Sequence, residues 1–114
     1  MTHRYKRYSR EQLQAEEAIL RKRLREAEQA GRRSHVAVNR RKIEIVQSYM
    51  LNRAAFNSGD IRSLKEDPEH LFQIDEVSGV VAWGHRIDRL THDRYEEKEA
   101  ILIALLGRKV QALR

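Results

Sequence analysis

The spacing of apolar residues changes from helical to strand-like near residue 53, and this change limits the fold more than any other feature. Residues 9–53 repeat apolar side chains at the spacing of amphipathic helices, whereas residues 54–114 contain mostly short strand patterns. Charge divides at the same place, with fourteen Lys and Arg against six Asp and Glu in residues 1–53, and nine against eleven afterwards. The sequence therefore predicts an α+β protein with a basic helical half.

Length and composition indicate a small protein of the cytoplasm. A chain of 114 residues can bury a core without disulfide or metal staples, and the absence of cysteine excludes thiol catalysis and cysteine-ligated zinc. The basic start is not followed by the apolar segment of a secretory signal, and the apolar run of residues 100–106 is too short to span a bilayer. We expect a cytoplasmic protein without a membrane partner.

Capping signals define the first helix, which should run from Ser9 to about residue 30. Ser9 and Gln12 have the spacing of a capping box, and Gly31 supplies the left-handed residue that often ends a helix. One narrow arc of the helix is apolar and should pack along a single partner: Leu13, Leu20, Leu24 and Ala27. Residues 1–8 form a basic arm, which we expect to be mobile.

A second helix should begin after a tight turn, with Ser34 as its cap, and run to about Leu51. The short connection favours an antiparallel hairpin over residues 9–53. The apolar arc of this second helix covers nearly half its circumference, which indicates two neighbours. We infer that the helix lies between the first helix and the strand region.

A β-hairpin over residues 70–86 is the best-specified element of the second half. Ser78 and Gly79 form its predicted two-residue turn, which would place Ile74 opposite Trp83. Side chains alternate across a strand, so one buried face should hold Phe72, Ile74, Val81, Trp83 and His85. Trp83 is accordingly predicted to lie in the core. A short strand over residues 61–64 and a charged turn should precede the hairpin.

The tail has two alternative structures. The run of residues 100–106 is apolar without helical spacing, which suits a buried closing strand followed by a turn near Gly107. A helix over residues 93–106 remains the alternative because several of its residues are good helix formers.

The order of motifs resembles the YfhH-like family of small bacterial proteins. Its motifs in this chain are Leu51 and Phe56, Gly59–Arg62, the Gly-Val-Val-Ala-Trp-Gly run of residues 79–84, and Ile103–Gly107. The resemblance implies a helical hairpin packed on a small SH3-like antiparallel β-barrel formed by residues 54–114 with a C-terminal closing segment, the whole being one compact unit. It also favours a strand for residues 100–104. The family is functionally uncharacterised, its members are sometimes called regulators, and no catalytic residue is defined for it.

The basic half of the chain offers a surface for phosphate groups. Arginine binds phosphate bidentately, and Tyr5 and Tyr8 in the arm are suited to stacking on bases. The predicted contacts are Arg4, Lys6, Arg7, Arg21, Lys22, Arg25, Arg32, Arg33, Arg40 and Arg41. The alternative is that these charges are simply the solvated face of surface helices.

Other kinds of site are disfavoured by the sequence. The predicted helices are too long for a helix-turn-helix motif, and a peptide groove would need several exposed aromatic residues close together. His85, His92 and Asp93 could form a metal or acid–base cluster, but His85 is better explained as a partly buried partner of Phe72. We therefore predict no enzyme, metal or cofactor.

Two functional hypotheses follow. In the first, a small non-enzymatic accessory or regulatory protein binds nucleic acid, or an acidic protein, through the basic helices. In the second, the hairpin is a protein-interaction or self-assembly module, and the chain forms a homo-oligomer. The first helix discriminates between them, because an exposed second stripe at Ala15 and Ile19 would favour self-assembly.

Overall fold

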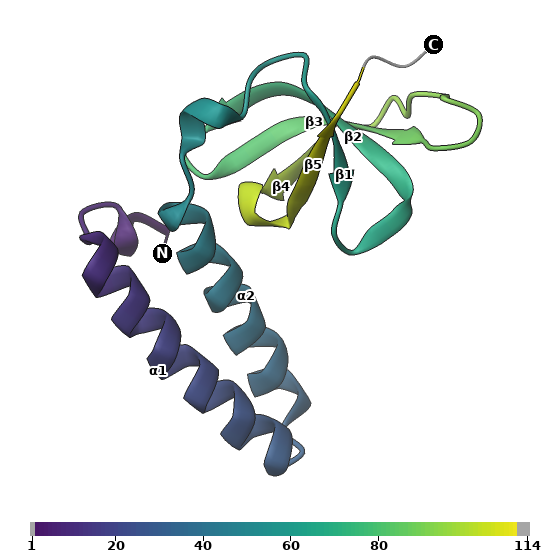
Figure 1. Cartoon of the computed structure of the whole chain (residues 1–114). Coiled ribbons are helices and arrows are strands. Elements are labelled where there is room, and N and C mark those ends of the chain that lie inside the picture. The colour runs from purple at the N-terminus through teal and green to yellow at the C-terminus, as the bar shows by residue number, and fades with distance from the viewer. Residues whose placement is uncertain (1, 112–114) are drawn as a thin grey trace. The chain divides into compact units, whose positions relative to one another are not determined.

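A computed structural model describes residues 2–111, which divide into two units (Figure 1). The helical unit extends to Leu51, and the sheet unit begins at Asn52. The structure determines each unit by itself, so the expected packing of the hairpin on the sheet stays a prediction. Within residues 2–111, no helix is long and apolar enough to cross a membrane.

Helix α1 (Arg10–Gln29) begins with the predicted capping box. The Ser9 hydroxyl accepts a hydrogen bond from the Gln12 N–H at 3.1 Å, and the Gln12 side chain accepts one from the Ser9 N–H at 2.8 Å. Two backbone donors that the helix itself leaves unpaired are thus satisfied reciprocally. The start predicted from the sequence is confirmed.

The turn after α1 uses a left-handed glycine, as expected. Gly31 has a φ of 68°, and its N–H donates to the Glu28 carbonyl at 3.2 Å. The Arg32 N–H reaches back to the carbonyl of Ala27 at 3.0 Å. This pair of bonds is the Schellman arrangement, which satisfies carbonyls at the end of a helix.

Helix α2 (Arg33–Met50) starts earlier than predicted, and Ser34 is not its cap. Arg32 occupies the capping position without a side-chain hydrogen bond, and its carbonyl accepts from the Val36 N–H at 3.0 Å. The prediction was wrong because the bonds that close α1 already turn the chain at Arg32, so α2 starts at the next residue.

The N-terminal segment is folded rather than mobile within the described residues. Thr2–Tyr5 forms a 3₁₀ turn, η1, and Tyr5 is only 5% exposed. The Tyr5 hydroxyl donates to Glu16 at 2.9 Å, and its ring lies edge to face against Tyr8 and Tyr49. Burial, followed by the bond to Glu16, raises the pKa of Tyr5. The ring of Tyr5 packs against the wide apolar face of α2. No sign of this long-range contact came from the basic residues around Tyr5 in the sequence.

The core of the helical unit confirms the predicted apolar stripe of α1. Its buried members come from η1, α1 and α2: Tyr5, Leu13, Leu20, Ile43 and Val46. Leu24 is partly buried against them, and Ala27 is also buried. The two helices therefore cover each other along one face of α1.

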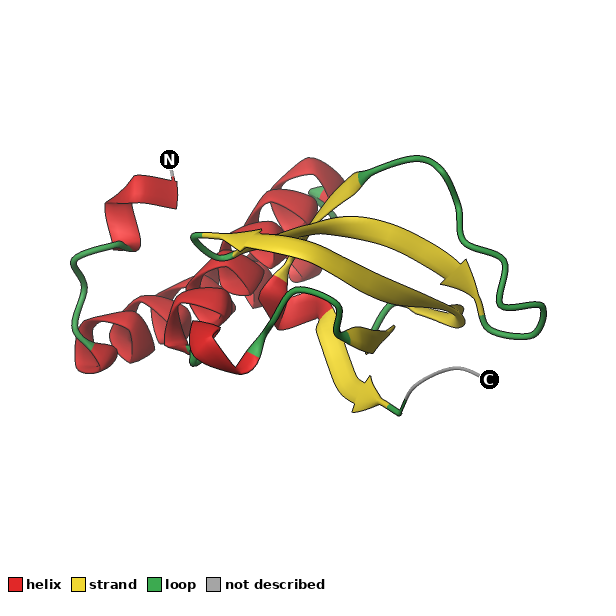
Figure 2. Cartoon of the chain, turned by 90° about the horizontal axis from the view of Figure 1, so that it is seen from above, coloured by secondary structure: helices red, strands yellow, loops and turns green. Residues whose placement is uncertain are grey.

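Five antiparallel strands form the sheet unit: β1 (Ile61–Leu64), β2 (Asp67–Ser78), β3 (Val81–Asp88), β4 (Glu99–Leu102) and β5 (Leu106–Val110). Their order is β4-β3-β2-β1-β5, with a 3₁₀ turn, η2 (Arg53–Ala55), before β1 and another, η3 (Ile103–Leu105), between β4 and β5. The strand over residues 61–64 is confirmed. The long strands β2 and β3 bend along their length (yellow in Figure 2).

The sheet is not closed into the barrel that the family resemblance implied. Strands β4 and β5 are its two edges, and no pairing joins them within residues 2–111. Only the three residues of η3 connect these edges, and such a connection spans at most about 14 Å. The edges of a flat five-stranded sheet would lie roughly 19 Å apart, so the sheet must curl. It curls toward closure, but the edge strands do not exchange hydrogen bonds.

The loop of the β2–β3 hairpin lies one residue later in the sequence than predicted. Ser78 pairs with Val81, so the loop is Gly79 and Val80 rather than Ser78 and Gly79. Gly79 has a φ of 60° in the first loop position, where a type II′ turn requires glycine. A bulge at Asp75 then shifts the pairing again, so that Ile74 faces Gly84 instead of Trp83.

The shifted register moves Trp83 out of the core. Trp83 is 38% exposed, whereas the neighbouring Ala82 is fully buried. Moving the loop by one residue moves the partners by two and leaves the two faces unchanged, whereas the bulge moves them by one and exchanges the faces, which explains the error. Phe72 and Ile74 are buried as predicted.

The strand alternative is correct for the start of the tail. Residues 99–102 form β4, while residues 103–105 form the 3₁₀ turn η3. Gly107 lies inside β5 rather than in a turn, because the pairing of Leu64 with Leu106 continues the sheet there.

Candidate nucleic-acid interface

All ten predicted contact residues are exposed and belong to the helical unit. They come from the N-terminal segment, from α1, from the turn and from α2: Arg4, Lys6, Arg7, Arg21, Lys22, Arg25, Arg32, Arg33, Arg40 and Arg41. The structure does not bring them together into one surface. Some of them are paired with carboxylates, and the length of α1 separates those at its start from those near the turn.

Four of these cations carry ion pairs with glutamates of the same unit. The pairs are Arg4–Glu16 at 3.3 Å, Arg21–Glu17 at 2.8 Å, Arg40–Glu28 at 3.4 Å and Arg41–Glu44 at 3.4 Å. Each pair is worth little to stability at a surface. However, each carboxylate reduces the local field that a phosphate would meet, so these four arginines are weaker candidates.

Glu17 is held in its charged form between α1 and α2. Its carboxylate accepts hydrogen bonds from Arg21 at 2.8 Å and from Gln47 at 2.9 Å. Burial alone would raise the pKa of Glu17, but the bonds from Gln47 and Arg21 outweigh burial and lower this pKa. The positive charge of Arg21 is therefore compensated by the Glu17 carboxylate at neutral pH.

Six predicted cations have no ion pair within residues 2–111: Lys6, Arg7, Lys22, Arg25, Arg32 and Arg33. Four of them form what we call the turn patch, which comprises Lys22, Arg25, Arg32 and Arg33. Lys6 and Arg7 precede the other end of α1, whose twenty residues span about 30 Å. Charges that far apart are screened at physiological salt, so the turn patch acts on its own.

Arg23 is a further cation that the sequence reasoning did not select. It is exposed, has no ion pair within the described residues, and lines an open cavity of about 350 Å³ with Glu26, Arg32 and His35. Arg23 lies close on the helix to the buried arc of Leu20 and Ala27, so a helical wheel does not place it on the outer face. The run of three cations at residues 21–23 was the available signal.

A larger cavity, of about 550 Å³, lies where α1 and α2 meet near the turn. Arg33, Val36 and Ala37 line it, but so do Glu28 and Glu44. Those two carboxylates make the cavity a poor site for a phosphate group.

The helical unit presents no exposed aromatic side chain in its described part. Tyr5 is buried and Tyr8 is half-buried, so the predicted stacking of bases on the arm is wrong for Tyr5 and restricted for Tyr8. The large exposed apolar residues of this unit are Ile19, Val38 and Leu51. The basic surface is therefore equipped to contact phosphate groups but not to stack on bases.

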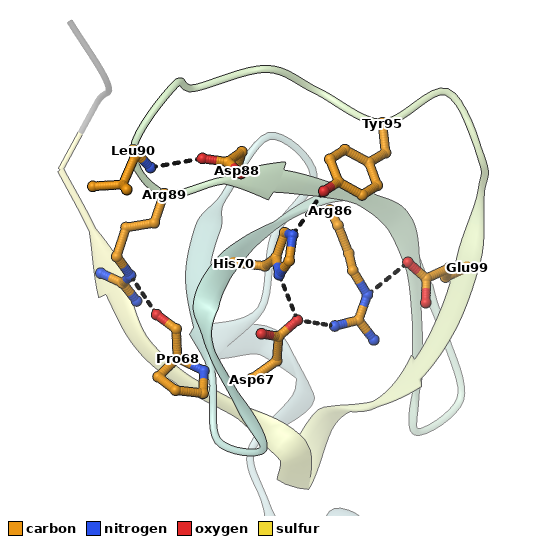
Figure 3. A network of polar contacts seen from close by, with 9 residues as sticks. All are labelled: Asp67, Pro68, His70, Arg86, Asp88, Arg89, Leu90, Tyr95 and Glu99. Carbon is orange, nitrogen blue, oxygen red and sulfur yellow. Dashed lines mark hydrogen bonds and ion pairs between the residues drawn. The ribbon is translucent and has the colours of Figure 1, made fainter.

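The sheet unit contains a polar network that sequence reasoning missed (Figure 3). The Asp67 carboxylate lies 2.8 Å from Nδ1 of His70 and 2.6 Å from the Arg86 guanidinium, which also bonds Glu99 at 2.8 Å. Nε2 of His70 lies 2.8 Å from the hydroxyl of Tyr95. These residues come from β2, β3, β4 and the loop after β3, and no local pattern links them.

This network shifts the pKa values of Asp67 and Arg86. The close contact with His70, reinforced by Arg86, lowers the pKa of Asp67 although partial burial opposes it. The hydrogen bond to Glu99, with a further contribution from Asp67, raises the pKa of Arg86. Asp67 and Arg86 therefore remain charged at neutral pH.

His85 is buried, as expected, but its partners differ from the prediction. It pairs with Gln73 rather than with Phe72, and Nδ1 donates to the Tyr95 carbonyl at 2.9 Å. Its Nε2 lies 3.1 Å from Asp75. Across residues 2–111, no group of three His, Cys, Asp or Glu side chains is placed to hold a metal ion.

Comparison with known proteins identifies the family. The model of the family described as "Protein of unknown function (DUF1811)" matches residues 3–107. The chain is also 33% identical over 109 residues to "Uncharacterized protein YfhH" of Bacillus subtilis (strain 168), a match that covers 96% of this chain and 99% of that protein. The YfhH-like resemblance noted from the sequence motifs is confirmed.

Proposed function

Since this chain belongs to the DUF1811 family, whose function is unknown, we propose a function from the geometry of its basic surface. The protein is a small, non-enzymatic accessory or regulatory factor of the cytoplasm that binds nucleic acid through its helical unit. The main contacts are made by the turn patch, assisted by Arg23.

The turn patch carries this proposal because its cations are exposed and have no ion pair within the described residues. Cations that neutralise phosphates release condensed counterions, which drives binding in a salt-dependent way. Arg25, Arg32 and Arg33 add planar forks suited to phosphate oxygens. An acidic protein is the alternative ligand for the same cations.

The absence of an exposed aromatic side chain from the described helical unit favours a duplex over a single strand. Single-strand binding combines a basic groove with aromatic residues that stack on the bases. Phosphate contacts alone position a protein on a duplex without reading its sequence. We therefore expect binding that is indifferent to sequence.

Fluorescence anisotropy with labelled duplex DNA, single-stranded DNA and RNA tests this function. Affinity for a random duplex should fall log-linearly between about 50 and about 300 mM salt, with a slope of about −3 to −6. The single strand should bind no more tightly than the duplex. No binding of any nucleic acid at the lowest salt would refute the proposal.

Self-assembly is a second candidate because α1 has an exposed apolar position opposite its buried stripe. Ile19 is 47% exposed, and the neighbouring Ala15 is exposed as well, although Leu13 and Leu20 are covered. Light scattering tests this function against the 13.5 kDa mass of one chain. A higher mass that Ile19→Lys returns to 13.5 kDa would support it, and a single-chain mass at high concentration would refute it.

The sheet unit is proposed as the scaffold, in an open SH3-like arrangement. Three features support this assignment: β5 returns beside β1, a 3₁₀ turn separates β4 from β5, and the sheet curls toward closure. A scaffold role agrees with the position of the turn patch, which belongs to the helical unit.

A further inference from the structure

Two close polar contacts link Asp67, His70 and Tyr95 in the sheet unit, an ion-pair contact on one side of His70 and a hydrogen bond on the other (Figure 3). The carboxylate and Nδ1 lie 2.8 Å apart, and Nε2 and the phenolic oxygen lie 2.8 Å apart. The His70 and Tyr95 rings meet edge to face, with centroids 5.3 Å apart. A carboxylate, an imidazole and a hydroxyl in this order form the arrangement that activates hydroxyl nucleophiles.

The partners of His70 determine which ring nitrogen acts as the base. The Asp67 carboxylate lies 2.8 Å from Nδ1 without hydrogen-bond geometry, and its negative charge favours the neutral tautomer that carries the hydrogen on Nδ1. The lone pair of Nε2 then faces the Tyr95 hydroxyl, which donates to it. Arg86 binds the same carboxylate oxygen and keeps it in place.

Tyr95 is positioned by its backbone, and its side chain stays accessible. Its carbonyl accepts from His85 and its N–H donates to the Arg86 carbonyl at 2.9 Å. The preceding turn is also ordered, because the Asp88 carboxylate accepts from the amides of Leu90 and Thr91 at 2.9 Å. Tyr95 is nevertheless 43% exposed, so a small reagent can reach it.

The charges around this tyrosine select the class of electrophile. The network contributes Asp67, Glu99 and Arg86, and Arg94, Glu96, Glu97 and Lys98 flank Tyr95 in the chain. These charges nearly balance, so they offer no positive field to hold a polyanionic phosphoryl donor. A neutral activated ester does not need one.

We propose that Tyr95 is an acylation site, whose hydroxyl accepts an acyl group from a neutral activated ester while His70 takes the phenolic proton. A bond forms between the Tyr95 oxygen and the acyl carbon, and the ester C–O bond breaks. The leaving alcohol departs as an oxyanion with the electron pair, and the proton passes from Nε2 to solvent. The acylated oxygen no longer donates to His70, which releases one of the bonds that hold the loop after β3.

The full chain treated with p-nitrophenyl acetate provides the test. Peptide mapping by mass spectrometry gives the acetylation rate at Tyr95, and N-acetyltyrosinamide under the same conditions serves as a tyrosine without a neighbouring base. Assistance by a positioned base should make Tyr95 react about tenfold faster or more. A rate at or below that of the model compound would overturn the proposal.

Two matched histidine variants separate the base from a purely structural role. His70→Asn keeps a donor where Nδ1 faces Asp67 but removes the nitrogen that faces the hydroxyl. His85→Asn keeps a donor toward the Tyr95 carbonyl and leaves the hydroxyl contact untouched. Acetylation of Tyr95 should slow about tenfold in the first variant and stay close to wild type in the second. Equal rates in wild type and His70→Asn would also overturn the proposal.

Discussion

Arg32 is tied to Ala27 through its backbone, because its N–H donates to the Ala27 carbonyl at 3.0 Å. This bond ends α1, and the carbonyl of the same arginine opens α2 by accepting from Val36. The side chain of Arg32 takes no part in either cap and remains exposed. The backbone thus presents two adjacent arginines, Arg32 and Arg33, at the tip of the hairpin.

Replacing Gly31 with alanine should destabilise the helical unit by about 1–2 kcal/mol. The residue has a φ of 68°, a conformation that an alanine Cβ disfavours. The free energy of unfolding, measured by chemical denaturation with helical circular dichroism, checks this value. Gln29→Ala at the end of α1 is the control and should change the free energy of unfolding little. An unchanged free energy of unfolding in Gly31→Ala would contradict the observed turn.

Replacing Tyr5 with alanine should cost about 3–5 kcal/mol in the unfolding of the helical unit, because a buried aromatic ring leaves a cavity. The same measurement applies, with Lys6→Ala as the exposed neighbour. A loss no larger than that of Lys6→Ala would show that the N-terminal segment is not part of the core.

Replacing Phe72 with alanine should destabilise the sheet unit far more than replacing Trp83. Phe72 is fully buried, so its replacement should lower the free energy of unfolding by about 3–5 kcal/mol. Trp83 is 38% exposed, so its replacement should lower this free energy less. The free energies of unfolding of the two variants decide between the registers. The opposite order would support the register predicted from the sequence.

How well each element could be predicted depends on how far apart in the sequence the residues that determine it lie. The Ser9 cap and the Gly31 turn depend on residues three to five positions apart, so the sequence reveals them. Trp83 was misplaced because its face depends on a bulge at Asp75, which shifts the pairing of the two strands by one residue.

The candidate site shows the same limit. The cations were visible in the sequence, but the pairing of Arg40 with Glu28 joins two helices, and twenty-five residues separate His70 from Tyr95. Neither contact leaves a local pattern.

The stability of the sheet unit should fall in acid through Asp67. Its pKa is lowered in the folded state, chiefly by the close contact with His70, so the unfolded chain binds a proton at higher pH than the folded one. The contribution is present above the ordinary value of 3.8 and is lost as pH falls through the lowered pKa. Unfolding free energies of wild type and Asp67→Asn across this range check the effect. The same acid dependence in both proteins would contradict it.

The central claim is that unpaired cations at the turn, rather than positive charge in general, bind the nucleic acid. Two triple variants with the same loss of charge test it most directly: Arg25→Gln, Arg32→Gln and Arg33→Gln against Arg21→Gln, Arg40→Gln and Arg41→Gln. In duplex DNA anisotropy, the first triple should reduce the salt slope by about 3 and abolish most binding. The second, whose arginines are already paired with glutamates, should bind nearly as tightly as wild type. Equal losses in both triples would contradict the account.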